Sequence, residues 1–195
     1  MVTNVLLTGV GGQGTITASH VLAQACLLSG WQVKKSEIHG MAQRGGSVES
    51  QVRYSADSEV YAPTIPAGEV DVLVGFELLE GLRGLPQVRE SGLIVVDPRR
   101  IVPLTVTMGY APYPDNAVEL LQASGRRVKV VAAFQEAQRL GEVRSANIIL
   151  IGAASSDLGL SREALEEAIR LTVKPQAREI NLAAFARGIE LAEKS

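Results

Sequence analysis

The feature that most restricts the fold is a glycine-rich turn, GVGGQGTI, at residues 9–16. It follows an apolar run typical of a buried strand and leads into a stretch with the composition of a helix, TASHVLAQACLL. Gly9, Gly11 and Gly14 fit the spacing G-x-G-x-x-G, a weak signal alone and a stronger one between a strand and a helix. The chain is therefore predicted to begin with the strand–turn–helix unit of an open α/β sheet.

Three interpretations of this turn are open: it binds a dinucleotide, it binds another anion, or its glycines serve packing alone. Gly9 is expected to allow the tight turn, Gly11 to let a ligand approach the backbone, and Gly14 to let the helix pack on its strand. Free amides at the helix start, with Thr15 beside them, form an anion site. Glu37 lies roughly 20 residues on, where dinucleotide-binding domains keep a ribose-binding acid, so an independent NAD(P)- or FAD-binding protein is an alternative. The third interpretation is that the glycines serve packing alone.

Apolar strand-like runs alternate with helical stretches over the first 133 residues. This alternation predicts an open, mostly parallel, Rossmann-like α/β sheet with helices on both faces. From residue 134 the pattern is mostly helical, so we expect a single domain over 1–195 with a helical C-terminal part. Strands are predicted at 4–9, 31–37, 70–76, 92–97 and 127–133, and helices at 14–29, 134–142, 145–159, 161–173 and 177–194.

Four local signals refine this outline. Residues 47–55 alternate apolar and polar side chains, as in a strand with one wet face near a sheet edge or in a hairpin. Ser161 is the expected N-cap of its helix, and Pro175 separates the last two helices. Residues 55–69 and 102–115 are predicted loops.

Composition excludes several classes of function. The formal net charge is −2, from 19 basic and 21 acidic residues. The overall electrostatic field therefore does not favour binding to nucleic acid or to an anionic membrane. No run is long enough to span a bilayer, and the N-terminus lacks a basic signal start. The single cysteine, Cys26, lies in an apolar stretch and is expected to be a buried, unreactive thiol of a cytoplasmic protein. One cysteine and two histidines provide no metal or iron–sulfur site within this chain.

The most distinctive stretch is SEIHGMAQRGGSVES, at residues 36–50. A polar, glycine-rich loop at the carboxyl end of a predicted strand belongs at the ligand-facing edge of an open sheet. We therefore expect His39, Gln43 and Arg44 to stand beside the first glycine turn. Arg44 offers a planar charged fork for a carboxylate or phosphate, and the glycines after it allow close backbone approach. A solvated loop with one surface arginine explains the same residue types equally well.

Together, GVGGQGTITASHVLA and EIHGMAQRGGSV resemble the gamma-type domain of the 2-oxoacid:ferredoxin oxidoreductases. Within that family they are most similar to the small subunits that act on indolepyruvate. The resemblance covers almost the whole chain, since SGLIVVD (91–97), SANIILIGAA (145–154) and EINLAAFARGIE (179–190) also look like that family. It implies a non-nicotinamide enzyme that oxidatively decarboxylates a 2-oxoacid and transfers the acyl group to coenzyme A.

The resemblance also implies which parts lie elsewhere. In this family a large subunit carries thiamine diphosphate, magnesium and the iron–sulfur clusters that reduce ferredoxin, and one cysteine cannot hold a cluster. By this resemblance the chain is a necessary subunit that is inactive alone and binds no cofactor firmly. In the absence of the large subunit, the chain could form a homodimer. Two Tyr- and Pro-rich stretches, YAPTIPAG (61–68) and MGYAPYP (108–114), or else the apolar faces of the terminal helices, are expected to contact the large subunit. Core packing under a loop explains the two stretches equally well. A scaffold that keeps the fold without chemistry is the remaining alternative.

Site residues follow from the same resemblance, and none of them is assigned catalysis. The glycine turn is the candidate for cofactor binding, with coenzyme A as the ligand considered: Gly9, Gly11, Gly12, Gln13, Gly14 and Thr15. The second loop is expected to line the 2-oxoacid site shared with the large subunit: Glu37, His39, Gly40, Met41, Gln43, Arg44, Gly45 and Gly46.

Overall fold

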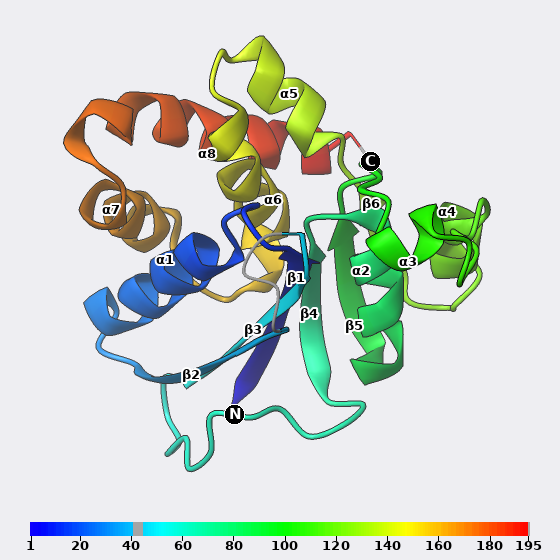
Figure 1. Ribbon diagram of the computed structural model, residues 1–195. Helices are drawn as coiled ribbons and strands as arrows, with labels where there is room; N and C mark the ends of the chain where they lie inside the picture. Colours follow the sequence, from blue (N-terminus) through cyan, green and yellow to red (C-terminus); the bar gives the residue numbers. More distant parts are fainter. Residues whose placement is uncertain (41–44, 195) are drawn as a thin grey trace.

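The computed structural model describes residues 1–40 and 45–194, and over these ranges the chain forms a six-stranded sheet of order β2-β3-β1-β4-β5-β6 (Figure 1). The strands are β1 (Thr3–Val10), β2 (Gln32–His39), β3 (Ser47–Ser55), β4 (Val70–Gly75), β5 (Val88–Val96) and β6 (Arg127–Val130). β1, β4, β5 and β6 pair in parallel. β1, β4 and β5 are rich in buried aliphatic side chains, as expected for strands covered on both faces, whereas β6 at the sheet edge is only partly buried. The predicted mostly parallel α/β sheet is confirmed.

One feature departs from the predicted winding. β3 inserts between β1 and β2 and is antiparallel to both, so β2 is the sheet edge rather than the neighbour of β1. The predicted hairpin is therefore correct, but β3 is interior and its expected wet face is covered. Gln51 is buried and accepts the Ile65 amide at 2.7 Å, and Arg53 donates to the Ala62 carbonyl at 3.0 Å. The segment 56–69 shields this face from water.

The helices cover both faces, as predicted (Figure 1). On one face lie α1 (Thr15–Leu28), α5 (Ala133–Arg139), α6 (Ala146–Ala154), α7 (Arg162–Thr172) and α8 (Arg178–Ala192), which bury the larger apolar core. α6 is buried and, apart from Asn147, apolar on all sides, and its backbone closely approaches that of α8. A Cβ at Gly152 would lie 2.2 Å from the Phe185 carbonyl oxygen, so only glycine permits this approach.

The other face is covered more thinly. α2 (Leu78–Gly84) and α4 (Ala117–Gln122) bury a second, smaller apolar core there. The predicted loop at 102–115 contains a short helix, α3 (Leu104–Thr107), opened by Pro103. Single 3₁₀ turns lie at Leu85–Gln87, Val143–Ser145, Ser155–Asp157 and Pro175–Ala177.

The structure confirms the two local signals predicted for the last two helices. Ser161 caps α7, because its hydroxyl accepts the Ala164 amide at 3.1 Å, and Pro175 starts the turn that separates α7 from α8. Cys26 is buried in α1, and desolvation raises the pKa of its thiol to about 12, which leaves it unreactive at neutral pH.

Candidate functional site

The glycine turn is held in place by the side chain of Gln13. Its Oε1 accepts the Val10 amide at 2.7 Å, and its Nε2 donates to the Phe76 carbonyl at 2.7 Å. Gln13 therefore ties the turn to the ends of β1 and β4, and both ends of its amide are used within the chain. The backbone reverses at Gly12, with φ of 102°.

Two of the glycines have different tasks from those expected. The left-handed turn residue is Gly12, not Gly9; a Cβ at Gly9 would lie 3.1 Å from Thr15 Cγ2, so Gly9 serves close packing. Gly14 has φ of 85° and packs on α6 rather than on its own strand. Asn147 of α6 donates from Nδ2 to the Gly14 carbonyl at 3.1 Å, and a Cβ at Gly14 would lie 2.5 Å from that Nδ2.

The second loop meets the turn in its described part. Gly11 donates its amide to the Gly46 carbonyl at 2.8 Å. His39 and Val48 face the turn across a hollow of about 470 Å³ that also reaches Thr15 and Ile16. The base of the hairpin is anchored to α2, since Ser47 donates its hydroxyl to Glu80 Oε2 at 2.5 Å. Gly40 and Gly45 are described, and the predicted site residues Met41, Gln43 and Arg44 lie outside the described residues.

Glu37 is not placed for ribose binding at the turn. It lies on β2, separated from β1 by β3, and it pairs with Lys35 at 2.6 Å. A dinucleotide-binding domain needs its acid on the strand next to β1, and the inserted antiparallel strand removes that arrangement.

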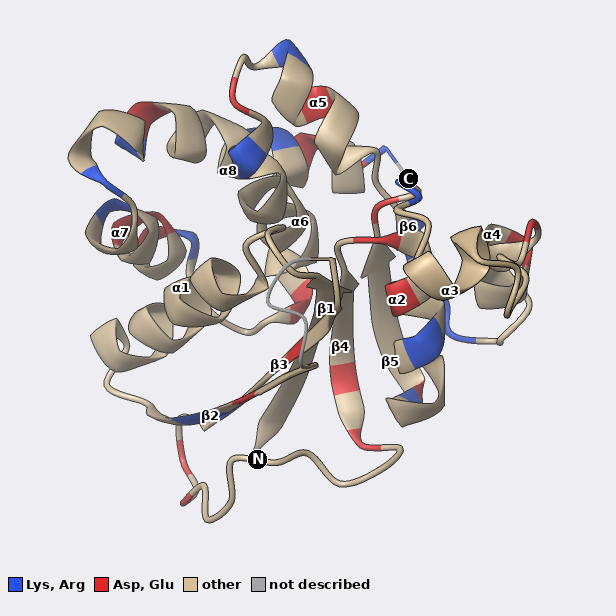
Figure 2. Ribbon diagram, viewed as in Figure 1, with Lys and Arg blue, Asp and Glu red and all other residues tan. Residues whose placement is uncertain are grey.

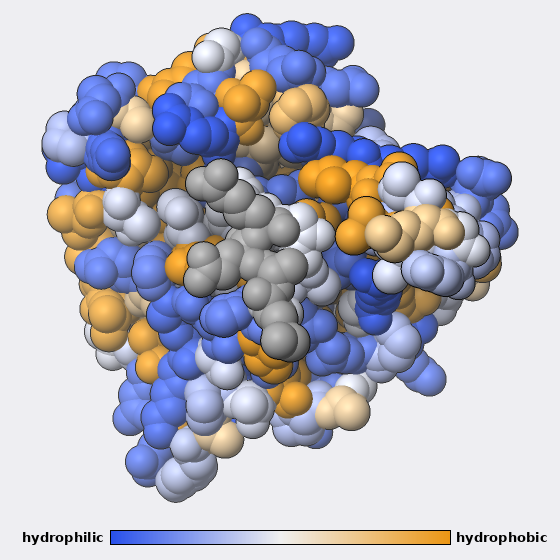
Figure 3. Space-filling view, in the orientation of Figure 1, coloured by the Kyte–Doolittle hydropathy of each residue, from blue (hydrophilic) through white to orange (hydrophobic). Residues whose placement is uncertain are grey.

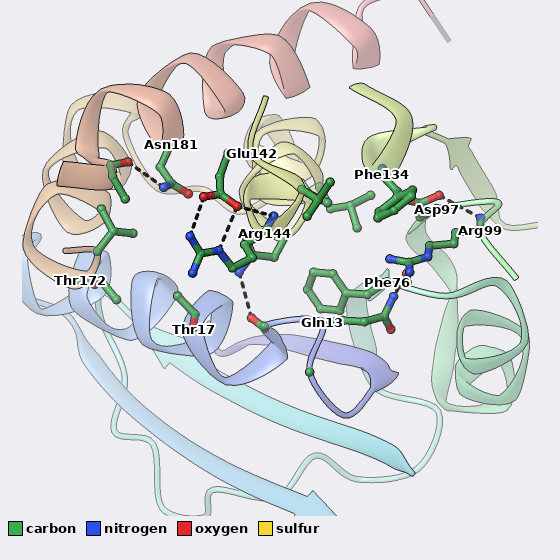
Figure 4. A pocket seen from close by; sticks show the side chains of 18 of the residues that line it. Gln13, Thr17, Phe76, Asp97, Arg99, Phe134, Glu142, Arg144, Thr172 and Asn181 are labelled. Carbon is green, nitrogen blue, oxygen red and sulfur yellow. Dashed lines mark hydrogen bonds and ion pairs between the residues drawn. The ribbon is translucent and has the colours of Figure 1, made fainter. Parts of the chain in front are cut away.

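A larger hollow of about 770 Å³ opens on the other side of the turn (Figure 4). It is bounded by the turn, the end of β5, the start of α6, and the segment between α7 and α8. Three basic side chains face it, Arg99, Arg144 and Lys174, beside apolar groups that include Phe76 and Phe134. This combination of an apolar lining, cations and an uncapped helix start suits an anionic ligand with an apolar part.

One wall of the hollow is a fixed ring–cation pair after β5. The buried Asp97 accepts the Arg99 amide at 2.9 Å and the Phe134 amide at 2.7 Å, joining the two segments (Figure 4). The Arg99 guanidinium lies 3.7 Å from the centre of the Phe134 ring. Desolvation raises the pKa of Asp97, while the two amides oppose that shift. Asp97 therefore positions Arg99.

The opposite wall carries an ion pair. Arg144 donates to the two carboxylate oxygens of Glu142 at 2.9 and 2.7 Å, and this hydrogen bonding lowers the pKa of Glu142 to about 2. Arg144 remains largely exposed, with 84% of its side chain accessible, so it also has donors free to meet a ligand. Lys174 and Asn181 complete this side of the hollow.

The sequence did not assign a role to most of these groups. Arg99, Phe134, Arg144 and Lys174 lie on four separate segments, and no local motif joins them. One signal was available: Asp97 and Arg99 follow a predicted parallel strand, and the carboxyl ends of such strands meet at the ligand edge.

The fold and the site define an α/β domain with a glycine turn facing a hollow lined by basic and apolar side chains. The family model for pyruvate ferredoxin/flavodoxin oxidoreductase matches residues 4–191, and the chain belongs to that family. Indolepyruvate oxidoreductase subunit IorB of Thermococcus kodakarensis is 38% identical over 98% of this chain and 96% of its own length. The same subunit of Pyrococcus horikoshii is 39% identical over the same shares. These relatives support the subunit interpretation over an independent NAD(P)- or FAD-binding protein.

Solved structures share the fold. The gamma subunit of keto/oxoacid ferredoxin oxidoreductase from Geobacter sulfurreducens superposes with a TM-score of 0.74, at 24% identity and 99% coverage of both chains. The 2-oxoglutarate:ferredoxin oxidoreductase of Magnetococcus marinus, with 2-oxoglutarate, coenzyme A and succinyl-CoA bound, gives 0.76 at 22% identity; the match covers all of this chain and 31% of that one. Among the residues that the structure describes, no group of three or more His, Cys, Asp or Glu could hold a metal, and no helix has the length and apolarity to cross a membrane.

Proposed function

We propose that this chain, as one domain over 1–195, is the small subunit of a cytoplasmic 2-oxoacid:ferredoxin oxidoreductase acting on indolepyruvate or another aryl pyruvate. Thiamine diphosphate, magnesium and iron–sulfur clusters belong to the large subunit, and ferredoxin is reduced there. The relatives that carry the indolepyruvate name, similar over nearly their whole length, support this assignment. The single cysteine supports it as well, because a cluster needs several thiolates.

In this proposal the chain binds the acyl acceptor, coenzyme A. The observation that carries the proposal is the hollow that joins the glycine turn to Arg99, Arg144 and Lys174. Phosphates suit the uncapped start of α1 and the guanidinium groups, whereas an adenine or pantetheine chain suits the apolar lining. Decarboxylation of the 2-oxoacid releases carbon dioxide and leaves an acyl group. Oxidation of this acyl group sends an electron pair to ferredoxin. The coenzyme A sulfur then takes the acyl group, and the thiol loses its proton.

The second loop contributes the shared 2-oxoacid pocket. This part of the proposal is supported by the hydrogen bond from Gly11 to Gly46 and by His39, which lines the same small hollow as the turn. Arg44 is retained as the candidate group for the substrate carboxylate on its residue type. Segment 101–115 is proposed as the contact with the large subunit, because it exposes Val102, Leu104, Met108 and Tyr110 (Figure 3).

Arg144→Gln in the reconstituted complex tests the acceptor site. We expect the KM for coenzyme A to rise about tenfold with kcat little changed, because one charge-assisted hydrogen bond is lost. Arg162→Gln is the control: Arg162 pairs with Glu166 at 2.7 Å on α7, so it also breaks an ion pair, but Arg162 does not line the hollow. Equal KM values for the two variants would assign coenzyme A to another surface.

Reconstitution tests the subunit role. Indolepyruvate-dependent ferredoxin reduction should require both polypeptides, and rates across aryl and aliphatic 2-oxoacids identify the substrate class. Oxidation of a 2-oxoacid by this chain alone would overturn the proposal. Tight binding of NADH or FAD to the isolated chain would favour the nucleotide-binding alternative.

A further inference from the structure

One side of the β2 backbone faces no other strand of the described chain, because β2 is the edge of the sheet. The Gly40 amide, just after β2, points toward β3 and donates to the Ser47 carbonyl at 3.3 Å. In an antiparallel pair, residues whose backbone groups face the neighbour alternate with residues whose groups face away. The backbone groups that point out from the sheet are therefore those of Val33, Lys35, Glu37 and His39.

The charges on β2 complement a second copy of the same strand. Lys35 and Glu37 flank Ser36 and, two residues apart on a strand, share one face of the sheet, with Lys35 Nζ 2.6 Å from Glu37 Oε1. Figure 2 shows basic and acidic positions along β2. In an antiparallel pair of β2 strands centred on Ser36, Lys35 stands opposite Glu37 of the second copy, and the reverse. Moving each copy by one residue sets Lys35 against Lys35 or Glu37 against Glu37. Because like charges directly opposite are destabilising, only the register centred on Ser36 matches both pairs.

An apolar stripe on α1 lies beside this edge. Ile16, His20, Ala23 and Leu27 recur at helical spacing, and Ile16 and Leu27 are 41% and 59% exposed. The stripe is on the β2 side of α1, since Ile16 and His39 line the same small hollow. A two-fold axis through the paired strands is perpendicular to the sheet, so it brings the two α1 stripes side by side on one face.

We propose that two copies of this chain associate through β2, as antiparallel edge strands centred on Ser36 that continue the sheet from one copy into the other. Lysine on an edge strand normally discourages strand addition, and here the opposing Glu37 neutralises Lys35 in this register. Lys34 points to the opposite face and donates to the Tyr61 carbonyl at 2.9 Å, so it is held within its own chain. The proposal is independent of the reaction that the subunit serves.

Charge reversal tests the pairing by sedimentation of the full chain. Lys35→Glu and Glu37→Lys should each weaken self-association by about tenfold, since every cross-strand pair becomes repulsive. A mixture of the two variants should restore association, because one chain then presents two acids and the other two bases. The double exchange Lys35→Glu/Glu37→Lys should also restore it, which rules out misfolding as the cause of the single effects.

A disulfide tests the register. Ser36 faces itself across the two-fold axis at a pair with Cα atoms about 4.5 Å apart, within disulfide range. Ser36→Cys should therefore cross-link two chains under mild oxidation, both in the isolated chain and in the complex with the large subunit. Lys34→Cys is the control, since that position is several residues from its own copy; Cys26 is buried and does not compete. A monomeric chain, a dimer that the charge variants leave unchanged, or a Ser36→Cys variant that does not cross-link would each overturn the proposal.

Discussion

At the scale of single residues, Gly14 couples the glycine turn to the helical part of the chain. Its backbone has φ of 85°, and its Cα faces Asn147, which lies 133 positions later in the sequence. Replacing Gly14 by alanine therefore adds two costs: a left-handed conformation, about 1 kcal/mol, and a contact with Asn147, about 1–3 kcal/mol.

Gly14→Ala should lower the free energy of unfolding by roughly 2–4 kcal/mol, measured by urea denaturation. Gly30→Ala is the matched control, because Gly30 also has a positive φ, 72°, but a Cβ there meets nothing within 4 Å. It should cost only the backbone part, about 1 kcal/mol. If both variants lost the same stability, the contact with Asn147 would have no energetic role.

At the scale of elements, the sequence predicts the strand and helix pattern well because that pattern is local. Buried parallel strands and helix N-caps such as Ser161 are recognisable from a few neighbouring residues. The position of β3 is not local: its alternating pattern predicts a strand near a sheet edge or in a hairpin, but only pairing with both β1 and β2 makes it interior. The same limit applies to the hollow, where Arg99, Arg144 and Lys174 come together only in the folded chain.

Segment 101–113 is fixed to the body of the molecule by one buried carboxylate. Glu77 is 1% exposed, and its Oε1 accepts the Tyr113 hydroxyl at 2.7 Å and the Ile101 amide at 3.0 Å. Tyr113→Phe should loosen the segment by about 1–2 kcal/mol, because a buried acceptor loses a donor. Faster hydrogen exchange in peptides covering 101–113 would report this. Tyr110→Phe is the control, because the Tyr110 side chain is 80% exposed, and it should leave hydrogen exchange unchanged. Equal exchange rates in the unaltered chain, Tyr113→Phe and Tyr110→Phe would show that Glu77 does not anchor the segment.

A second link between elements is sensitive to pH. Arg187 of α8 donates to Glu136 of α5 at 2.8 Å, and this bond lowers the pKa of Glu136. A carboxylate with a depressed folded pKa stabilises the fold fully above its unfolded pKa, about 4.3, and loses that effect as pH falls through the folded value. Glu136→Gln should cost about 1 kcal/mol at neutral pH and little in acid. Urea denaturation of the unaltered chain and of Glu136→Gln at several pH values measures this. A difference in the free energy of unfolding that stays the same down to low pH would contradict the link.

At the scale of the whole molecule, the three surfaces proposed to bind a ligand or a partner occupy different places. The hollow opens beside the glycine turn, the β2 edge lies at one end of the sheet, and α3 stands at the other side of the molecule (Figure 1). The proposed acyl acceptor, second copy and large redox subunit would therefore not compete for the same surface of this small domain. It also means that each surface has variants that leave the other two intact.

The surface assigned to the large subunit is the one most open to direct test. Leu104 is 67% exposed at the start of α3. Leu104→Asp should weaken binding to the large subunit by about 10- to 100-fold, which is the loss expected for one apolar side chain buried at an interface. Leu171→Asp is the control, since Leu171 is 53% exposed on α7, on the opposite side of the molecule. Titration of each purified variant against the large subunit measures the difference. If Leu171→Asp weakened binding and Leu104→Asp did not, the large subunit would dock on the α1–α7 side and not on segment 101–115.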